Sequence, residues 1–144
     1  MAYDYFVASR YRNKQAVLDL VSRIRARGKS AYCFFESDEA QFGVVTPDED
    51  PEAIMQKFES LIGWRDDPKV IAIFEADMKA LRDSAAIILL LPAGKSAHIE
   101  AGVGYGLGKK LILIGEQHET ESLYLIFSEA YASVEEFVAS MSDN

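Results

Sequence analysis

The chain has 144 residues, of which 49% are hydrophobic, so it can bury one sizeable core and we expect residues 1–144 to form a single domain. Its net charge of −8 argues against a nucleic-acid polymer or an anionic membrane as the partner, although a few local cations could hold a small anionic ligand. Because no run approaches the roughly 20 apolar residues of a membrane span and the first residues lack the apolar core of a signal peptide, a cytoplasmic protein is expected.

The cysteine and histidine residues do not suggest a metal centre. Cys33 is the only cysteine and lies in an apolar run, so a buried inert thiol is favoured over a nucleophile. His98 and His118 are far apart in the sequence, and neither a zinc-ligand set nor a Ser-His-Asp arrangement can be assembled. We expect no metal and no other cofactor.

The first third of the chain contains two strand signals separated by a helix signal. A strand is expected at residues 3–8, and Ser9 is a plausible N-cap for a helix over about 12–27, which Gly28 ends. A second strand is expected at 30–35. The polar stretch 36–49 is then read as a long loop.

Two helices begin with the same signal, an aspartate followed by proline at the first helical position, at 50–51 and at 67–68. Gly63 and Trp64 end the first helix, and the second is expected over 68–82. Asp77 falls inside the apolar stripe of the second helix. An ionised carboxylate there is costly unless it is paired or bound to a ligand. The alternative is that Asp77 lies at the edge of the stripe and reaches solvent.

The remainder of the chain continues the alternation. Residues 85–91 form a continuous apolar run, typical of a strand covered on both faces of a parallel sheet. A helix to about 108, a strand at 110–114, a short helix at 121–129, an edge strand at 130–133 and a helix at 134–141 follow. This order predicts an α/β fold with a mainly parallel sheet of about five strands and right-handed crossovers.

Loops at the carboxyl ends of such strands converge into one crevice. The loops after Ala8, Phe35 and Leu91 all open on that side. The candidate substrate-binding residues therefore come from the first and third of these loops: Ala8, Ser9, Arg10, Tyr11, Arg12, Gly94, Lys95, Ser96 and His98. Tyr11, Arg12 and Lys14 could bind phosphate or form a solvated first turn, and His98 is more often a hydrogen-bonding residue than a catalyst.

Glu100 is the leading candidate for chemistry. It stands near the start of the helix that follows the apolar run, on the face that is expected to press on the sheet. The helix N-terminus stabilises the anion, whereas burial would raise its pKa. This balance suits a nucleophile or a general base. The glycines at 102, 104, 106 and 108 do not have dinucleotide-fingerprint spacing and are read as packing positions.

Taken in order, several short segments resemble the nucleoside 2-deoxyribosyltransferase family and its relatives, the deoxynucleoside monophosphate N-glycosidases. They span most of the chain, from Tyr3 to about Ile114. The matching segments are Tyr5-Phe6-Val7-Ala8, Asp77, Asp83, Leu91-Pro92, Glu100-Ala101-Gly102 and Gly108-Lys109-Lys110-Leu111-Ile112.

The resemblance implies a flavodoxin-like or Rossmann-like three-layer sandwich and cleavage or transfer at the N-glycosidic bond of a nucleoside or nucleotide. It implies that Glu100 is the nucleophile, that Tyr5 holds it by a hydrogen bond and that Asp77 contacts or protonates the base. It also implies a homodimer or larger homo-oligomer, which the apolar residues 123–127 support.

Gly94 stands where the transferases carry an acidic residue and the monophosphate hydrolases a serine. With Lys95 and Arg10 or Arg12 nearby, this suggests an anionic substrate such as a nucleotide. Two alternatives remain: a nicotinamide-dinucleotide (NAD) glycohydrolase that uses the same glutamate, and a nucleotide-binding or sensing module without chemistry.

Overall fold

The computed structural model describes residues 1–36 and 50–141, and its centre is a sheet of five parallel strands in the order β2-β1-β3-β4-β5. This is the strand order of flavodoxin-like folds. The expected α/β fold with a mainly parallel sheet of about five strands is confirmed. The strands are β1 (Tyr3–Ala8), β2 (Ala31–Tyr32), β3 (Ser84–Leu90), β4 (Lys110–Ile114) and β5 (Glu129–Tyr131).

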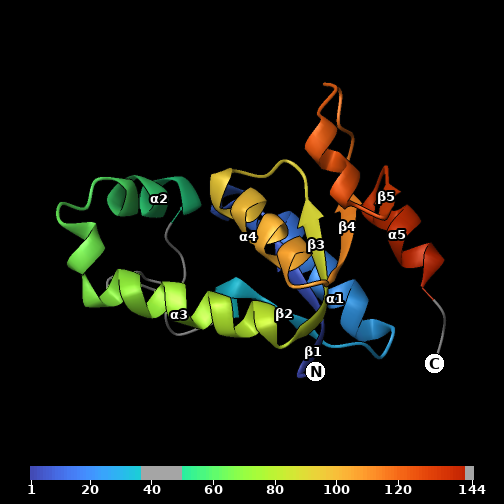
Figure 1. Cartoon of the computed structure of the whole chain (residues 1–144), viewed down its shortest axis with the longest axis horizontal. Coiled ribbons are helices and arrows are strands. Elements are labelled where there is room, and N and C mark those ends of the chain that lie inside the picture. The colour runs from blue at the N-terminus through green and yellow to red at the C-terminus, as the bar shows by residue number, and fades with distance from the viewer. Residues whose placement is uncertain (37–49, 142–144) are drawn as a thin grey trace.

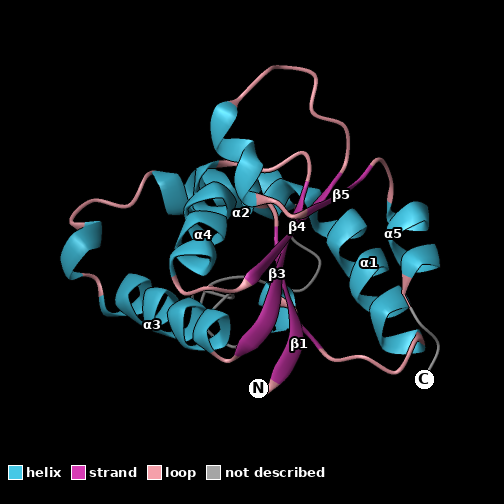
Figure 2. Ribbon diagram, turned by 45° about the vertical axis from the view of Figure 1, so that its right-hand side comes forward, coloured by secondary structure: helices cyan, strands magenta, loops and turns pink. Residues whose placement is uncertain are grey.

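Helices cover both faces of the sheet (Figures 1 and 2). Neighbouring residues of a strand point to opposite faces, so in β1 Val7 joins one core cluster, whereas Phe6 and Ala8 join the other. The Val7 side is covered by α1 (Lys14–Ala26) and α5 (Val134–Ser140). The Phe6 side is covered by α3 (Pro68–Arg82) and α4 (Lys95–Gly106). The result is three layers.

Both Asp-Pro signals start helices as the sequence predicts. Asp50 caps α2 (Pro51–Glu59) by accepting a hydrogen bond from the N–H of Glu52, and Asp67 caps α3 by accepting one from the N–H of Lys69. Gly63, with φ of 69°, lies between the two helices. In Figure 1, α2 and α3 extend away from the sheet on the same side as α4.

Only one of the glycines in α4 is required for packing. A Cβ added at Gly104 would lie 2.6 Å from Cγ1 of Ile87, so the helix approaches β3 closely at this residue. At Gly102 and Gly106 a Cβ would meet no atom within 4 Å. The packing interpretation is therefore correct for Gly104 and wrong for these other two.

Two predicted elements are shorter than expected. The second strand ends at Tyr32, because β2 is an edge strand that pairs only with β1, and a 3-10 helix (Phe34–Glu36) follows. The predicted helix at 121–129 is a 3-10 helix (Ser122–Ile126). It stops because Phe127 is extended and the N–H of Ser128 already bonds to the carbonyl of Leu111. Of the expected loop 36–49, residues 37–49 lie outside the described residues.

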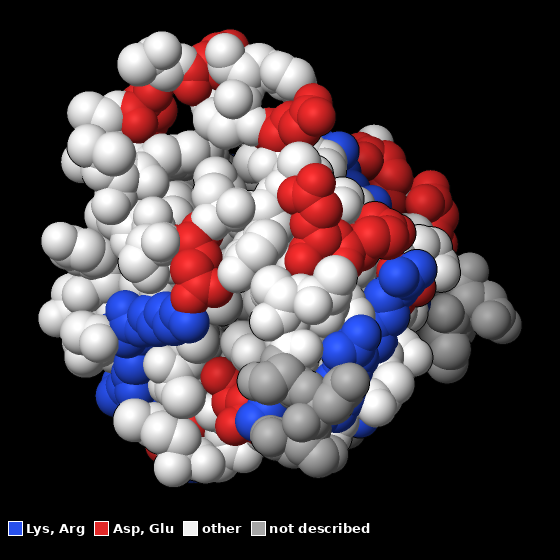
Figure 3. Space-filling model, turned by 90° about the vertical axis from the view of Figure 1, so that its right-hand side faces the viewer, with Lys and Arg blue, Asp and Glu red and all other residues white. Residues whose placement is uncertain are grey.

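Acidic side chains form a cluster on one part of the described surface. Acidic side chains gather over the loop between β4 and β5, where Glu116, Glu119 and Glu121 are exposed (Figure 3). Such a surface repels a polyanion. Within residues 1–36 and 50–141, none of the helices has the length and apolar character needed to cross a bilayer.

Candidate functional site

A cavity of about 320 Å³ lies at the carboxyl ends of β1 and β3. The chain leaves β1 toward α1 on one face of the sheet and leaves β3 toward α4 on the other. Ligands of open α/β sheets bind at this kind of divergence. Its walls come from the loop after β1, the start of α4, and residues of α2 and α3. The predicted site residues that line it are Ser9, Arg10, Tyr11, Arg12, Asp77, Gly94, Lys95, Ser96 and Glu100.

Glu100 and Asp77 bring two carboxyl groups to the cavity from different helices. Glu100 is on α4, one turn beyond Ser96, and Asp77 is on α3. Both are partly buried. This position does not support the alternative in which Asp77 lies at the edge of the apolar stripe of α3 and reaches bulk solvent. The hydroxyl of Tyr32 lies 3.5 Å from Oδ1 of Asp77 and donates toward it.

Burial, and to a smaller extent the negative charge of Asp77, raise the pKa of Glu100 to about 8. The protonated form of Glu100 is therefore favoured at neutral pH. A carboxyl group with a pKa displaced in this way inside a cavity is typical of a site that handles protons or makes a covalent intermediate.

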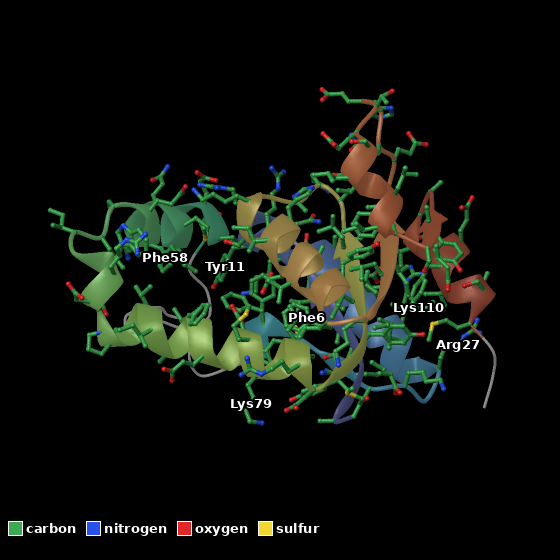
Figure 4. All side chains as sticks on the ribbon, in the orientation of Figure 1. Phe6, Tyr11, Arg27, Phe58, Lys79 and Lys110 are labelled. Atoms are coloured by element: carbon green, nitrogen blue, oxygen red, sulfur yellow. The ribbon has the colours of Figure 1, made fainter. Side chains whose placement is uncertain are left out.

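Aromatic side chains form the apolar wall opposite these carboxyl groups. Tyr11 packs edge-on against Phe35, with ring centroids 4.7 Å apart, and against Phe34 at 5.7 Å. Phe58 of α2 faces the same space, and Figure 4 shows it with Tyr11 between α2, α3 and α4. Flat apolar walls of this kind suit a planar heterocycle.

Two exposed cations and a helix N-terminus lie at the rim. Arg10 and Lys95 line the cavity and are exposed to solvent. Gly94 is the N-cap of α4 and supplies no side-chain hydrogen bond to the first turn. The positive end of the α4 dipole therefore remains available beside the two cations, an arrangement that favours an anionic group.

Arg12 lines the cavity but is already engaged. Its guanidinium donates to Glu52 through Nε and to Glu59 through Nη2 at 2.8 Å. Both carboxylates belong to α2. Arg12 therefore ties α2 to the loop after β1. These ion pairs support neither of the two alternatives for Arg12, which were phosphate binding and a solvated first turn.

Ser9 is also engaged, and it is not a helix cap. Its hydroxyl donates to the carbonyl of Leu90 at 2.8 Å and accepts from the side-chain amide of Asn13 at 3.1 Å. The N-cap of the 3-10 helix that follows is Arg10. Ser9 thus joins the loop after β1 to the end of β3.

Three predicted site residues lie outside the cavity lining. Tyr5 is on the opposite face of the sheet from α4, where its ring packs against Phe137 and its neighbours include Lys110. It is not brought to Glu100. Figure 4 labels Lys110 on that side, away from the cavity. Ala8 is buried in the core between β1 and the helices α3 and α4.

The third is His98, which is on the flank of α4 away from Glu100. Its Nδ1 is 2.8 Å from the carbonyl oxygen of Gly94, and its Nε2 is 2.7 Å from the hydroxyl of Tyr124. The two rings stack with centroids 5.8 Å apart. The interpretation of His98 as a hydrogen-bonding residue describes its position better than a catalytic role does.

Sequence reasoning missed most of the apolar lining. The additional lining residues are Phe6, Val7, Val17, Phe34, Phe35, Met55, Phe58, Glu59, Ile73 and Ala97. A signal existed for Phe34 and Phe35, because they follow the second strand at its carboxyl end, where loops converge on the crevice. Met55 and Phe58 lie on the amphipathic helix α2, and nothing in their spacing distinguishes a cavity wall from a core.

Solved structures with this fold include a CMP N-glycosidase from Clostridium botulinum and the TIR domain of a Toll-related receptor from Hydra magnipapillata. The glycosidase has a TM-score of 0.56 at 17% identity, over 94% of this chain and 93% of its own. The TIR domain has a TM-score of 0.56 at 14% identity, over 90% and 83%. A search with protein-family models finds no match, and a search among curated proteins finds none either. These likenesses show the fold.

Proposed function

We propose that this protein cleaves the N-glycosidic bond of a nucleotide, with Glu100 as the nucleophile and Asp77 as the acid that protonates the base. The observation that carries the proposal is the pair of carboxyl groups in a cavity with aromatic walls and a cationic rim. The structural likeness to a CMP N-glycosidase, which covers most of both chains, supports the general kind of activity and not the roles of the two carboxyl groups.

The proton count of the pair fits the reaction. The attacking carboxylate must be ionised, and the departing base must gain a proton. In the proposed reaction, the proton of Glu100 passes to Asp77 when the substrate enters. Glu100 then attacks C1′ and forms an ester bond as the C1′–N bond breaks. The electron pair of that bond goes to the base, which takes the proton from Asp77.

A second step releases the sugar. Water attacks C1′, the ester bond breaks, and its electron pair returns to the Glu100 carboxylate. Asp77, now ionised, accepts the proton that the water loses. If a second base attacks in place of water, the result is transfer. Adding a free base to the assay distinguishes the two outcomes, because only transfer makes a new nucleoside or nucleotide.

The rim supports an anionic substrate. A phosphate group beside Arg10, Lys95 and the N-terminus of α4 would gain charge-assisted hydrogen bonds. We expect the substitution Lys95→Ala to raise the KM of a nucleotide about tenfold and to leave that of the matching nucleoside unchanged. Equal turnover of both, unaffected by Lys95→Ala, would contradict a nucleotide substrate.

The test of the chemistry is base release from a panel of CMP, the other ribonucleoside and deoxyribonucleoside monophosphates, the corresponding nucleosides and NAD, followed by chromatography. Glu100→Ala should abolish release. Glu75→Ala is the matched control, since Glu75 is an exposed carboxylate on α3 that does not line the cavity. Release that survives in Glu100→Ala would overturn the mechanism, and release from NAD alone would favour the NAD glycohydrolase.

A non-catalytic binding module is the second candidate. The specific observation in its favour is that the likeness to a receptor TIR domain has the same TM-score, 0.56, as the likeness to the glycosidase. Tight binding of a panel member without base release would favour this module. Isothermal titration beside the chromatographic assay separates the two candidates.

We also propose that two copies of the chain associate. Large apolar side chains are exposed on three elements: Phe74 on α3, Ile99 on α4 and Leu125 in the 3-10 helix Ser122–Ile126. Light scattering should give the mass of a dimer, and Leu125→Glu should shift it toward the monomer. A monomer at working concentration in the unmodified protein would contradict this association.

A further inference from the structure

The side chains of His98 and Tyr124 join the start of α4 to a segment that lies elsewhere in the chain. The Nδ1 atom of His98 is 2.8 Å from the carbonyl oxygen of Gly94, and the Nε2 atom is 2.7 Å from the Tyr124 hydroxyl. The stacked rings place the two residues, 26 positions apart, in direct contact. Neither residue lines the cavity.

The partners determine which ring nitrogen carries hydrogen. A carbonyl oxygen can only accept, so Nδ1 must donate to Gly94. In the neutral ring Nε2 is then the acceptor, and the hydroxyl of Tyr124 donates to it. The tautomer of His98 with hydrogen on Nδ1 therefore gives both ring nitrogens a hydrogen-bond partner. The same Gly94 carbonyl also accepts from the backbone N–H of His98 at 3.2 Å.

This contact fixes the backbone where α4 begins and leaves the N–H groups of the first turn available. Helices usually begin with a side chain that bonds to the first turn, but Gly94 has none. The His98 ring instead holds the first turn through the Gly94 carbonyl. Tyr124 in turn is packed edge-on against Phe127, with centroids 5.4 Å apart, and both pack against the core cluster that contains Leu111.

We propose that His98 and Tyr124 act together as positioning residues for the ligand-binding start of α4, named here the His98–Tyr124 brace. The proposal rests on the proposed function, because the residues it positions, Gly94 and Lys95, are those assigned to the anionic part of the substrate. Glu100 is less dependent on the brace, since Ala97, Ala101 and Gly104 bury the rest of α4 against the sheet.

Three substitutions separate the parts of the brace. Tyr124→Phe removes the hydroxyl and keeps the stacked ring. His98→Gln places an amide near the position of Nε2, and His98→Asn places one near Nδ1. His118→Gln is the matched control, because His118 is the other histidine of the chain and lies in an exposed loop.

The kinetic test compares the effect of each substitution on KM with its effect on kcat, with CMP as the substrate. We expect Tyr124→Phe and His98→Gln each to raise KM about three- to tenfold, the effect of one hydrogen bond, with kcat changed less than twofold. His98→Asn should retain the Gly94 contact but lose the Tyr124 hydrogen bond and the stacked ring, so its KM should rise at least as much as that of Tyr124→Phe. An unchanged KM in all three variants, or an equal fall of kcat, would overturn the brace.

Hydrogen exchange in the free protein tests the brace even if no substrate is turned over. The N–H groups of Ile99 and Glu100, in the first protected turn, should exchange about three- to tenfold faster in Tyr124→Phe. Those of Val103 and Gly104 should not change. Uniform acceleration along α4, or none, would overturn the brace. Failure of Glu100→Ala to abolish base release would instead overturn the proposed function.

Discussion

Two pairs of carboxyl groups, one on α2 and one on α3 and α4, each contribute to the wall of the cavity, and they differ in exposure and in partners. Glu52 and Glu59 on α2 are about half exposed and share the guanidinium of Arg12, which lowers the pKa of Glu52. Glu100 and Asp77 are partly buried, and the pKa of Glu100 rises to about 8. The first pair holds α2 in place. In the second pair, burial and the charge of Asp77 make the ionised form of Glu100 unfavourable.

The largest expected difference between the pairs is in activity. Asp77→Asn removes the proposed acid and should lower kcat about 10²- to 10⁴-fold, the usual contribution of a general acid. Glu59→Gln, which also changes a cavity carboxylate, should lower it less than about threefold because that side chain serves Arg12. Base release measured at saturating CMP decides this. Equal losses in both variants would remove the distinction between the pairs.

The second difference is in the pH dependence of stability. The folded-state pKa of Glu100 lies near 8, above its ordinary value of 4.5, so the folded protein binds this proton more tightly than the unfolded chain. The contribution of Glu100 to the free energy of unfolding is fully present below about pH 4.5 and is lost as the pH rises through 8.

Glu100→Gln should therefore match the unmodified protein near pH 4.5 and exceed it near pH 9. At 1.36 kcal/mol per pKa unit, the gain at pH 9 is at most about 5 kcal/mol. Urea unfolding at several pH values measures it. A constant difference between the two proteins across this range would show that Glu100 titrates normally.

The smallest expected effect is at the exposed pair. Arg12→Ala breaks both bonds to α2, so Met55 and Phe58 should be less well placed in the cavity wall. Exposed ion pairs are weak and screened by salt. We expect a rise in KM within about threefold, reproduced in the unmodified protein by high salt, and little change in melting temperature. A loss comparable with that of Asp77→Asn would give Arg12 a direct role.

The sequence predicted the framework because its signals are local. A continuous apolar run specifies β3, and an aspartate before proline specifies the starts of α2 and α3. Asp77 and Glu100 stood out because each is an acidic residue on an apolar helix face. Those features need no knowledge of the tertiary arrangement.

The rest of the site depends on contacts that local patterns do not encode. In β1, aromatic residues occur on both faces, so periodicity alone could not decide that Phe6 and not Tyr5 faces α4. The Arg12 bonds to α2 and the contact between His98 and Tyr124 join segments 26 to 47 positions apart. Such pairings are set by the packing of whole elements.

Gly94 has a consequence for how this site can be altered. A Cβ added there would lie 3.6 Å from the Cβ of Arg10, an ordinary contact, and its φ of −97° suits any residue. A serine or aspartate side chain can therefore be introduced at the cavity rim without strain in the backbone. A side chain at this position therefore changes the chemistry of the cavity rim without a change in the backbone, which makes it a starting point for redesigning the cavity.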